Sequence, residues 1–83
     1  FIPMYKTEGA AAADLVANIP ANDAGERTIR FCPGQLIKID CGFSMALPPG
    51  WEAQIRARSS LAAKGIQVTN SPATIDDDYR GRL

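Results

Sequence analysis

Three consecutive carboxylates stand in the stretch "TIDDDYRG", Thr74–Gly81. If this stretch is extended, its side chains alternate, so Asp76 and Asp78 share one face and Asp77 takes the other. Asp76 directly follows the apolar Ile75, where one carboxylate can be partly enclosed. An enclosed carboxylate can orient and deprotonate a water molecule. At most two of the three acids can therefore point at one site, with Asp76 a candidate for the chemistry and Asp77 expected to face solvent.

Two further groups beside the acids suit a nucleoside. The ring of Tyr79 offers a flat face to a sugar or a base. Asn70 precedes Ser71-Pro72, and a turn there would fix an amide that presents a donor and an acceptor to a pyrimidine edge. The alternative interpretation is a surface turn with three solvated acids.

A second stretch, "RARSSLAAKG", combines a guanidinium with two hydroxyl groups. Arg58, Ser59 and Ser60 stand where a strand gives way to a helical turn, so free N–H groups, hydroxyls and a positive charge converge. This combination is typical of a phosphate or pyrophosphate site. The alternative, favoured by this stretch alone, is an ordinary helix in which Ser59 or Ser60 is the N-cap and the arginine is solvated.

A third stretch, "GAAAADL", ends in one acid, Asp14. We interpret it as a short strand or extended loop whose small side chains allow close approach of a ligand. Mg²⁺ usually keeps several waters, so one carboxylate touching its water shell would suffice beside a bound phosphate.

The elements that must position these groups are β-strands. Apolar residues alternate with more polar ones over 35–47, and "PPG" then forces a turn before the alternation resumes over 52–58. A shorter alternation covers 28–32, and Gly42 marks a bulge or bend. Residues 18–27 are rich in turn formers and are expected to form a surface loop. The pattern predicts an all-β sandwich or barrel with one helical turn at 59–65.

Composition narrows the function further. The 83 residues suffice for one small domain, which would gain stability from oligomerisation. The nine basic and nine acidic residues give a formal net charge of zero, so the charge does not favour binding to nucleic acid or to a membrane surface. Four arginines nevertheless cluster locally, which leaves room for a local anion site: Arg56, Arg58, Arg80 and Arg82. The absence of histidine excludes a His-containing zinc site or a Ser-His or Cys-His pair within this chain. Cys32 and Cys41 are expected to be buried thiols rather than a bridge.

The three stretches, in this order, resemble the first three motifs of the trimeric dUTPase (dUTP pyrophosphatase) family. "AAAADL" resembles Ala-Gly-x-Asp-Leu, "RARSSLAAKGI" resembles a motif built on Arg-Ser-Gly or Arg-Ser-Ser, and "NSPATIDDDYRG" resembles Asn-x-x-Gly-x-Ile-Asp-x-Asp-Tyr-x-Gly. The resemblance implies a Mg²⁺-dependent enzyme that hydrolyses dUTP to dUMP and pyrophosphate by attack of water on the α-phosphorus.

The resemblance also implies a role for each matching residue. Asp76 would hold the attacking water, and Asp14 would face the Mg²⁺–triphosphate through water. The remaining residues would bind substrate. Arg58, Ser59 and Ser60 would bind the phosphates, Asn70 would bind the uracil edge, and the backbone of Thr74 and Ile75 would line the nucleoside pocket. Tyr79 would pack against deoxyribose, and its ring would leave no room for a 2′-hydroxyl.

The fold implied is an all-β, jelly-roll-like barrel or β-clip subunit whose sites lie between the subunits of a homotrimer. On this interpretation residues 1–83 are a single domain of the family, incomplete at the C-terminus, because the fourth motif and the Gly-rich fifth would lie beyond Leu83. The expected location is the cytoplasm, including that of a host cell for a viral protein, or the nucleus in a eukaryote.

Two alternatives remain open at this stage. A dCTP deaminase shares the fold and the Arg-Ser-Ser-Leu-Ala stretch, but its third motif resembles Ile-Asp-Pro-Gly-aromatic rather than "IDDDYRG". A non-catalytic dUTPase-like module would bind nucleotide or a protein and turn over nothing.

Overall fold

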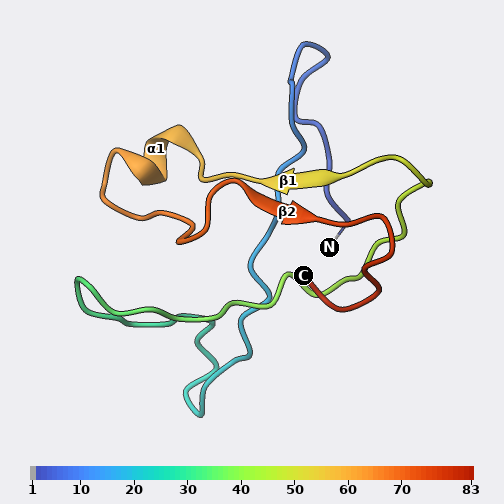
Figure 1. Cartoon of the computed structure of the whole chain (residues 1–83). Helices are drawn as coiled ribbons and strands as arrows, with labels where there is room; N and C mark the ends of the chain where they lie inside the picture. Colours follow the sequence, from blue (N-terminus) through green and yellow to red (C-terminus); the bar gives the residue numbers. More distant parts are fainter. Residues whose placement is uncertain (1) are drawn as a thin grey trace. The chain divides into compact units, whose positions relative to one another are not determined.

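The computed structural model describes residues 2–83, which divide into two compact units. Unit 1 comprises the residues up to Ser44 together with Arg82–Leu83, and unit 2 comprises Met45–Gly81. Unit 2 holds strand β1 (Ala53–Ile55), helix α1 (Ser59–Ala62) and strand β2 (Ala73–Ile75) (Figure 1). The described residues are therefore mostly extended or looped, with very little helix, as the sequence predicts.

The sheet of unit 2 is an antiparallel pair. Ala53 lies opposite Ile75, Gln54 opposite Thr74 and Ile55 opposite Ala73. In both strands the middle residue is exposed and the outer two are half-buried. The alternation continues to Ala57 after β1, so the period of two in the sequence is confirmed here.

The turn before β1 follows from its two prolines and one glycine. The Trp51 N–H donates to the Pro48 carbonyl at 3.1 Å, and Gly50 has a φ of +86°. Proline at the second position and a positive-φ glycine at the third are the signature of a type II turn. Such a turn uses the N–H of Trp51, and the N–H of Gly50 has to find its partner elsewhere.

Helix α1 occupies the first part of the helical turn predicted at 59–65. The Ala62 N–H donates to the Arg58 carbonyl at 2.9 Å, and Gly65, at a φ of +86°, follows the last turn. The N-cap residue is Arg58, in an extended conformation, and it makes no side-chain capping bond. The predicted serine N-cap is therefore wrong, because both serines are already helical and an N-cap residue must be extended.

Unit 1 is held by backbone pairing around residues 40–44. The Asn18 N–H donates to the Asp40 carbonyl at 2.7 Å, and the Cys41 N–H donates to the Leu83 carbonyl at 2.7 Å. Ser44 and Arg82 form an antiparallel bridge beside them. The last residues of the chain thus pair with 41–44.

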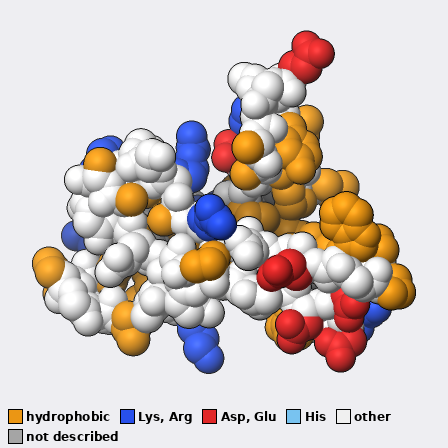
Figure 2. Space-filling view, turned by 45° about the horizontal axis from the view of Figure 1, so that its top comes forward, with side chains coloured by type: hydrophobic (Ala, Val, Ile, Leu, Met, Phe, Trp, Pro, Cys, Tyr) orange, Lys and Arg blue, Asp and Glu red, His pale blue; other side chains and the backbone are white. Residues whose placement is uncertain are grey.

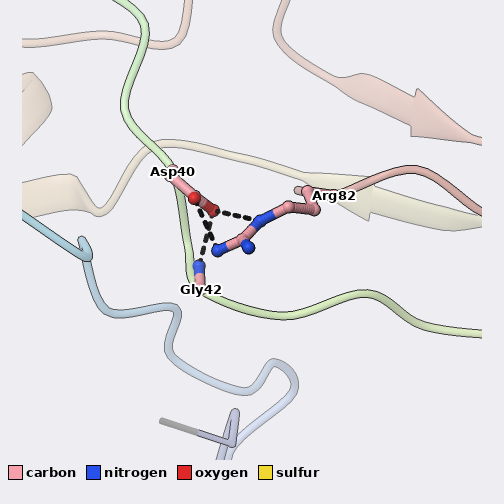
Figure 3. A network of polar contacts seen from close by, with 3 residues as sticks. All are labelled: Asp40, Gly42 and Arg82. Carbon is pink, nitrogen blue, oxygen red and sulfur yellow. Dashed lines mark hydrogen bonds and ion pairs between the residues drawn. The ribbon is translucent and has the colours of Figure 1, made fainter.

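Asp40 adds a polar network to this pairing (Figure 3). Its carboxylate accepts the Gly42 N–H at 2.7 Å and forms an ion pair with Arg82 at 2.6 Å. The bond from Gly42, together with the hydrogen bond and charge of Arg82, lowers the pKa of Asp40, with partial burial opposing the shift. Gly42 lies in the bend that the sequence predicts.

The N-terminal segments of unit 1 are loops joined by one isolated bridge. Met4 and Asp14 form an antiparallel bridge, as expected for an extended stretch at 9–15. The loop predicted at 18–27 is confirmed: the Asn22 side chain accepts the N–H groups of Ala24 and Glu26 at 3.0 and 2.9 Å. The alternation predicted at 28–32 is wrong, because every residue there is exposed and no strand partner divides the two faces.

The period of two predicted over 35–47 is confirmed over 41–47, where half-buried and exposed residues alternate. It is wrong over 35–40, where Ile37 is half-buried but Ile39 is exposed like its polar neighbours. No side chain among residues 2–83 is fully buried, and large apolar side chains such as Leu36 (75 %) and Trp51 (68 %) are well exposed. Figure 2 shows apolar side chains at the surface of the face it presents. Both cysteines are free thiols, yet Cys32 is exposed and Cys41 only half-buried, so the prediction of buried thiols is wrong. None of the helices in the described part is long and apolar enough to cross a membrane.

Candidate active site

The acids of the third stretch follow directly after β2. The Tyr79 N–H donates to the Asp76 carbonyl at 3.2 Å, which closes a turn with Asp77 and Asp78 at its centre. Asp76 and Asp78 are exposed, whereas Asp77 is half-buried. The expected partial enclosure of Asp76 is therefore wrong within this chain, because the turn places Asp77 and not Asp76 on the covered face. The turn presents the carboxylate of Asp76 to solvent on the same loop that carries the Tyr79 ring.

Asp77 does not face solvent, contrary to the expectation from the sequence. Its Oδ2 accepts the Gly50 N–H at 2.7 Å, which is the donor left over by the type II turn before β1. Ala73, Ile75 and Asp77 all lie on the half-buried face of the period of two. The alternation therefore already placed Asp77 on the covered face, and the charge of the side chain was the misleading signal.

Arg80 is used inside the same turn. Its Nη1 donates to the carbonyl of Asp77 at 2.7 Å and to that of Tyr79 at 2.9 Å. Arg56 bonds the Gln54 side chain at 2.8 Å, and Arg82 pairs with Asp40. Three of the four clustered arginines thus have local hydrogen-bond or ion-pair partners.

Gly81 makes room for the ring of Tyr79. A Cβ built at Gly81 would lie 2.6 Å from Cζ and 3.0 Å from Cε1 of that ring, and still nearer to its hydroxyl oxygen. These separations are far below ordinary van der Waals contact. The ring is thus folded back over the glycine, which fixes where its flat face lies.

The second stretch begins immediately after the extension of β1. Arg58, Ser59 and Ser60 are all exposed at the start of α1. The amides of the first helical residues have no partner within a helix. The two serine N–H groups and hydroxyls, with the guanidinium before them, are therefore chemically suited to phosphate oxygens.

Asn70 and the two residues before Asp76 complete the unit 2 part of the candidate site. Asn70 is exposed in a turn that the bond from the Ser71 N–H to the Val68 carbonyl closes at 3.1 Å, as the sequence predicts. Thr74 and Ile75 are the last two residues of β2, with Thr74 exposed and Ile75 half-buried.

Comparison with known proteins matches the family model for dUTPase to residues 1–83. The chain belongs to the dUTPase family. Three curated relatives carry the name deoxyuridine 5′-triphosphate nucleotidohydrolase. Those from Chlamydia felis and Bartonella bacilliformis are 51 % and 49 % identical over 99 % of this chain, which covers 52 % and 45 % of their own lengths. The relative from Desulfotalea psychrophila is 46 % identical over 99 % of this chain, which covers 51 % of that relative's length.

The chain spans about half the length of the dUTPase relatives it matches. All three relatives are named as nucleotidohydrolases and none as a deaminase.

Asp14, the residue expected from the sequence to face a metal ion through water, belongs to unit 1. It is half-buried, and its N–H donates to the Met4 carbonyl at 3.1 Å. Residues 2–83 contain no group of three or more acidic, cysteine or histidine side chains that could hold a metal ion. A single carboxylate fits Mg²⁺ only if waters and substrate phosphates supply the other oxygens, which is the usual manner of Mg²⁺ binding at nucleotides.

Two residues of the candidate site were missed from the sequence. Asp77 was assigned to solvent, although its position two residues after Ile75 indicated the covered face. Gly81 matches the last glycine of the third motif, but no role was assigned to it, since its need for a missing side chain comes from the folded-back ring of Tyr79.

Proposed function

We propose that the protein hydrolyses dUTP to dUMP and pyrophosphate. The observation that carries the proposal is the turn after β2, where Asp76 and Tyr79 are joined by a 3.2 Å backbone bond. One short loop thus carries a carboxylate for water and a ring for the sugar. Membership of the dUTPase family and the names of the relatives support the same reaction.

In the proposed reaction Asp76 acts as a general base. Its carboxylate accepts a proton from a water molecule, whose oxygen then bonds to the α-phosphorus of dUTP. The bond between the α-phosphorus and the oxygen that bridges to the β-phosphorus breaks, and pyrophosphate leaves with the electron pair. The exposure of Asp76 lets it return the proton to solvent for the next cycle.

The phosphates are proposed to lie at the start of α1. Arg58 supplies a positive charge and a planar set of donors, Ser59 donates from its hydroxyl and Ser60 from its backbone N–H. Each of these groups is exposed, so binding costs little desolvation of the protein.

The nucleoside is proposed to lie along the end of β2. Asn70 would pair with the uracil edge, and the backbone of Thr74 and Ile75 would line the pocket. Tyr79 would pack against deoxyribose and exclude a 2′-hydroxyl, in the ring position that Gly81 allows.

Mg²⁺ is the proposed cofactor, with Asp14 as its contact through water. A bound Mg²⁺ would neutralise the triphosphate and favour departure of pyrophosphate. The contribution of Asp14 itself is to accept hydrogen bonds from the water shell of the ion.

We further propose that the subunits are jelly-roll-like, that they work in the cytoplasm and that they bind dUTP. We also propose that they assemble as a homotrimer. The support is the absence of any fully buried side chain in residues 2–83 and the exposure of Leu36 and Trp51. Side chains of this size are expected to bury their apolar surface against another surface.

Asp76→Asn in the protein expressed from its complete reading frame tests the reaction. With Mg²⁺ present, we expect kcat for dUTP to fall by at least about 100-fold, because the amide cannot take the proton. Affinity for dUMP, measured by calorimetry, should stay near that of the parent. The matched control is Asp23→Asn, in an exposed loop of unit 1.

The same assay separates the other possibilities. Hydrolysis by Asp76→Asn at the parent rate would remove Asp76 from the reaction. A parent that binds dUMP but releases no pyrophosphate from dUTP would instead favour the non-catalytic module, and ammonia release from dCTP would favour the deaminase.

A further inference from the structure

Asp77 connects two loops that lie 27 positions apart in the sequence. Its carboxylate accepts the Gly50 N–H at 2.7 Å, and its carbonyl accepts Arg80 Nη1 at 2.7 Å. The type II turn at 48–51 and the turn after β2 are therefore joined through this one residue. Both bonds lie within unit 2.

The register of the sheet explains why a side chain is needed there. Ala53 pairs with Ile75, so continuing the same register by two residues brings Asp77 opposite Trp51. Neither residue belongs to a strand, and the backbone ladder has ended. The carboxylate reaches the Gly50 N–H and thereby extends the connection beyond the last backbone rung.

We propose that Asp77 is a positioning residue for the neighbouring base Asp76, an inference that rests on the proposed function. Asp77 holds the start of the turn against the 48–51 turn, while Arg80 holds its end. Asp76 lies between Asp77 and the last residue of β2, so it is restrained on both sides. Proton transfer depends steeply on where the base stands, and a shift of about 1 Å can cost two orders of magnitude in rate.

Asp77→Ala and Asp77→Asn, made in the protein with its complete reading frame, separate this role from a general structural one. The alanine variant removes the acceptor, so we expect kcat for dUTP to fall by about tenfold, with KM changed by less than about threefold. The asparagine variant keeps an oxygen acceptor without the charge, so kcat should stay within about threefold of the parent. Asp23→Ala, at an exposed acid, is the matched control.

Hydrogen exchange at the Gly50 amide provides a readout that does not depend on activity. We expect exchange to be faster by about tenfold in Asp77→Ala than in the parent or in Asp23→Ala, because the amide loses its acceptor. Unchanged exchange would overturn the inference.

The kinetic outcomes distinguish the two proposals. If the parent hydrolyses dUTP and Asp77→Ala matches Asp23→Ala, the positioning role is wrong and the proposed function stands. If the parent does not hydrolyse dUTP, the proposed function fails and the positioning role fails with it. If the alanine variant does not fold, the asparagine variant alone tests the inference. A tenfold loss of kcat in Asp77→Asn would contradict it, because asparagine keeps the side-chain oxygen that accepts the Gly50 N–H.

Discussion

Gly81→Ala is the sharpest perturbation of the proposed sugar site, because it moves a ring without touching the acids. The added Cβ would lie 2.6 Å from Cζ of Tyr79, whereas ordinary contact begins near 3.4 Å. The ring end must therefore retreat by about 0.8 Å, and its hydroxyl by more. The backbone at Gly81 lies outside the left-handed region, so alanine causes no backbone strain.

The cost of this retreat falls on the position of the ring rather than on the fold. Tyr79 is 42 % exposed, so its ring has room to turn, at a cost of about 1 kcal/mol in side-chain conformation. A displaced ring opens space where a 2′-hydroxyl would lie. We expect the preference for dUTP over UTP to fall by about tenfold, which corresponds to about 1.4 kcal/mol.

The assay is pyrophosphate release from dUTP and from UTP, compared as kcat/KM, with Tm measured in parallel. Gly9→Ala is the matched control, since a Cβ built at Gly9 meets nothing within 4 Å. Tyr79→Ala should lose more discrimination than Gly81→Ala. A Gly81→Ala protein with parental selectivity would refute the reasoning, because the ring would then not govern the choice of sugar.

Two predictions concern unit 1. Asp40→Asn should lower Tm at pH 7, because the lowered pKa of Asp40 means that its charged form stabilises the fold above pH 3.8. The difference in Tm from the parent should close as the pH falls below that value. A difference in Tm that does not depend on pH would contradict the role of the charge. Cys41 should be alkylated by iodoacetamide more slowly than the exposed Cys32 at pH 8, because burial and then the charge of Asp40 raise the pKa of the half-buried Cys41 thiol. Mass spectrometry of the two cysteine-containing peptides measures the two alkylation rates. Equal rates would contradict the prediction.

Local patterns in the sequence predicted the elements of unit 2 well. Period-two alternation identified the half-buried positions beside β1, and "SSLAAKG" located α1. These features depend on neighbours within a few residues, which a sequence displays directly. The alternation at 28–32 failed because a strand also needs a partner, and nothing in five residues shows whether one is present.

Long-range pairing accounts for what the sequence did not reveal about the site. The acceptor role of Asp77 depends on a turn 27 positions away, and the local charge run suggested solvent instead. The need for Gly81 depends on the rotamer of Tyr79, which is a property of the folded chain. Asp76 and Tyr79 were singled out from residue type and resemblance, and their catalytic and sugar-binding roles stay predictions.

The return of the chain to unit 1 at Arg82 has a consequence for synthesis on the ribosome. The residues of unit 2 are contiguous, so the pairing of β1 with β2 and the bond from Gly50 to Asp77 can form once Gly81 has emerged. Unit 1 begins earlier but lacks the partners of Cys41 and Ser44 until Arg82 and Leu83 appear. The backbone groups at Cys41 and Ser44 therefore gain these partners only after the whole of unit 2 has been synthesised.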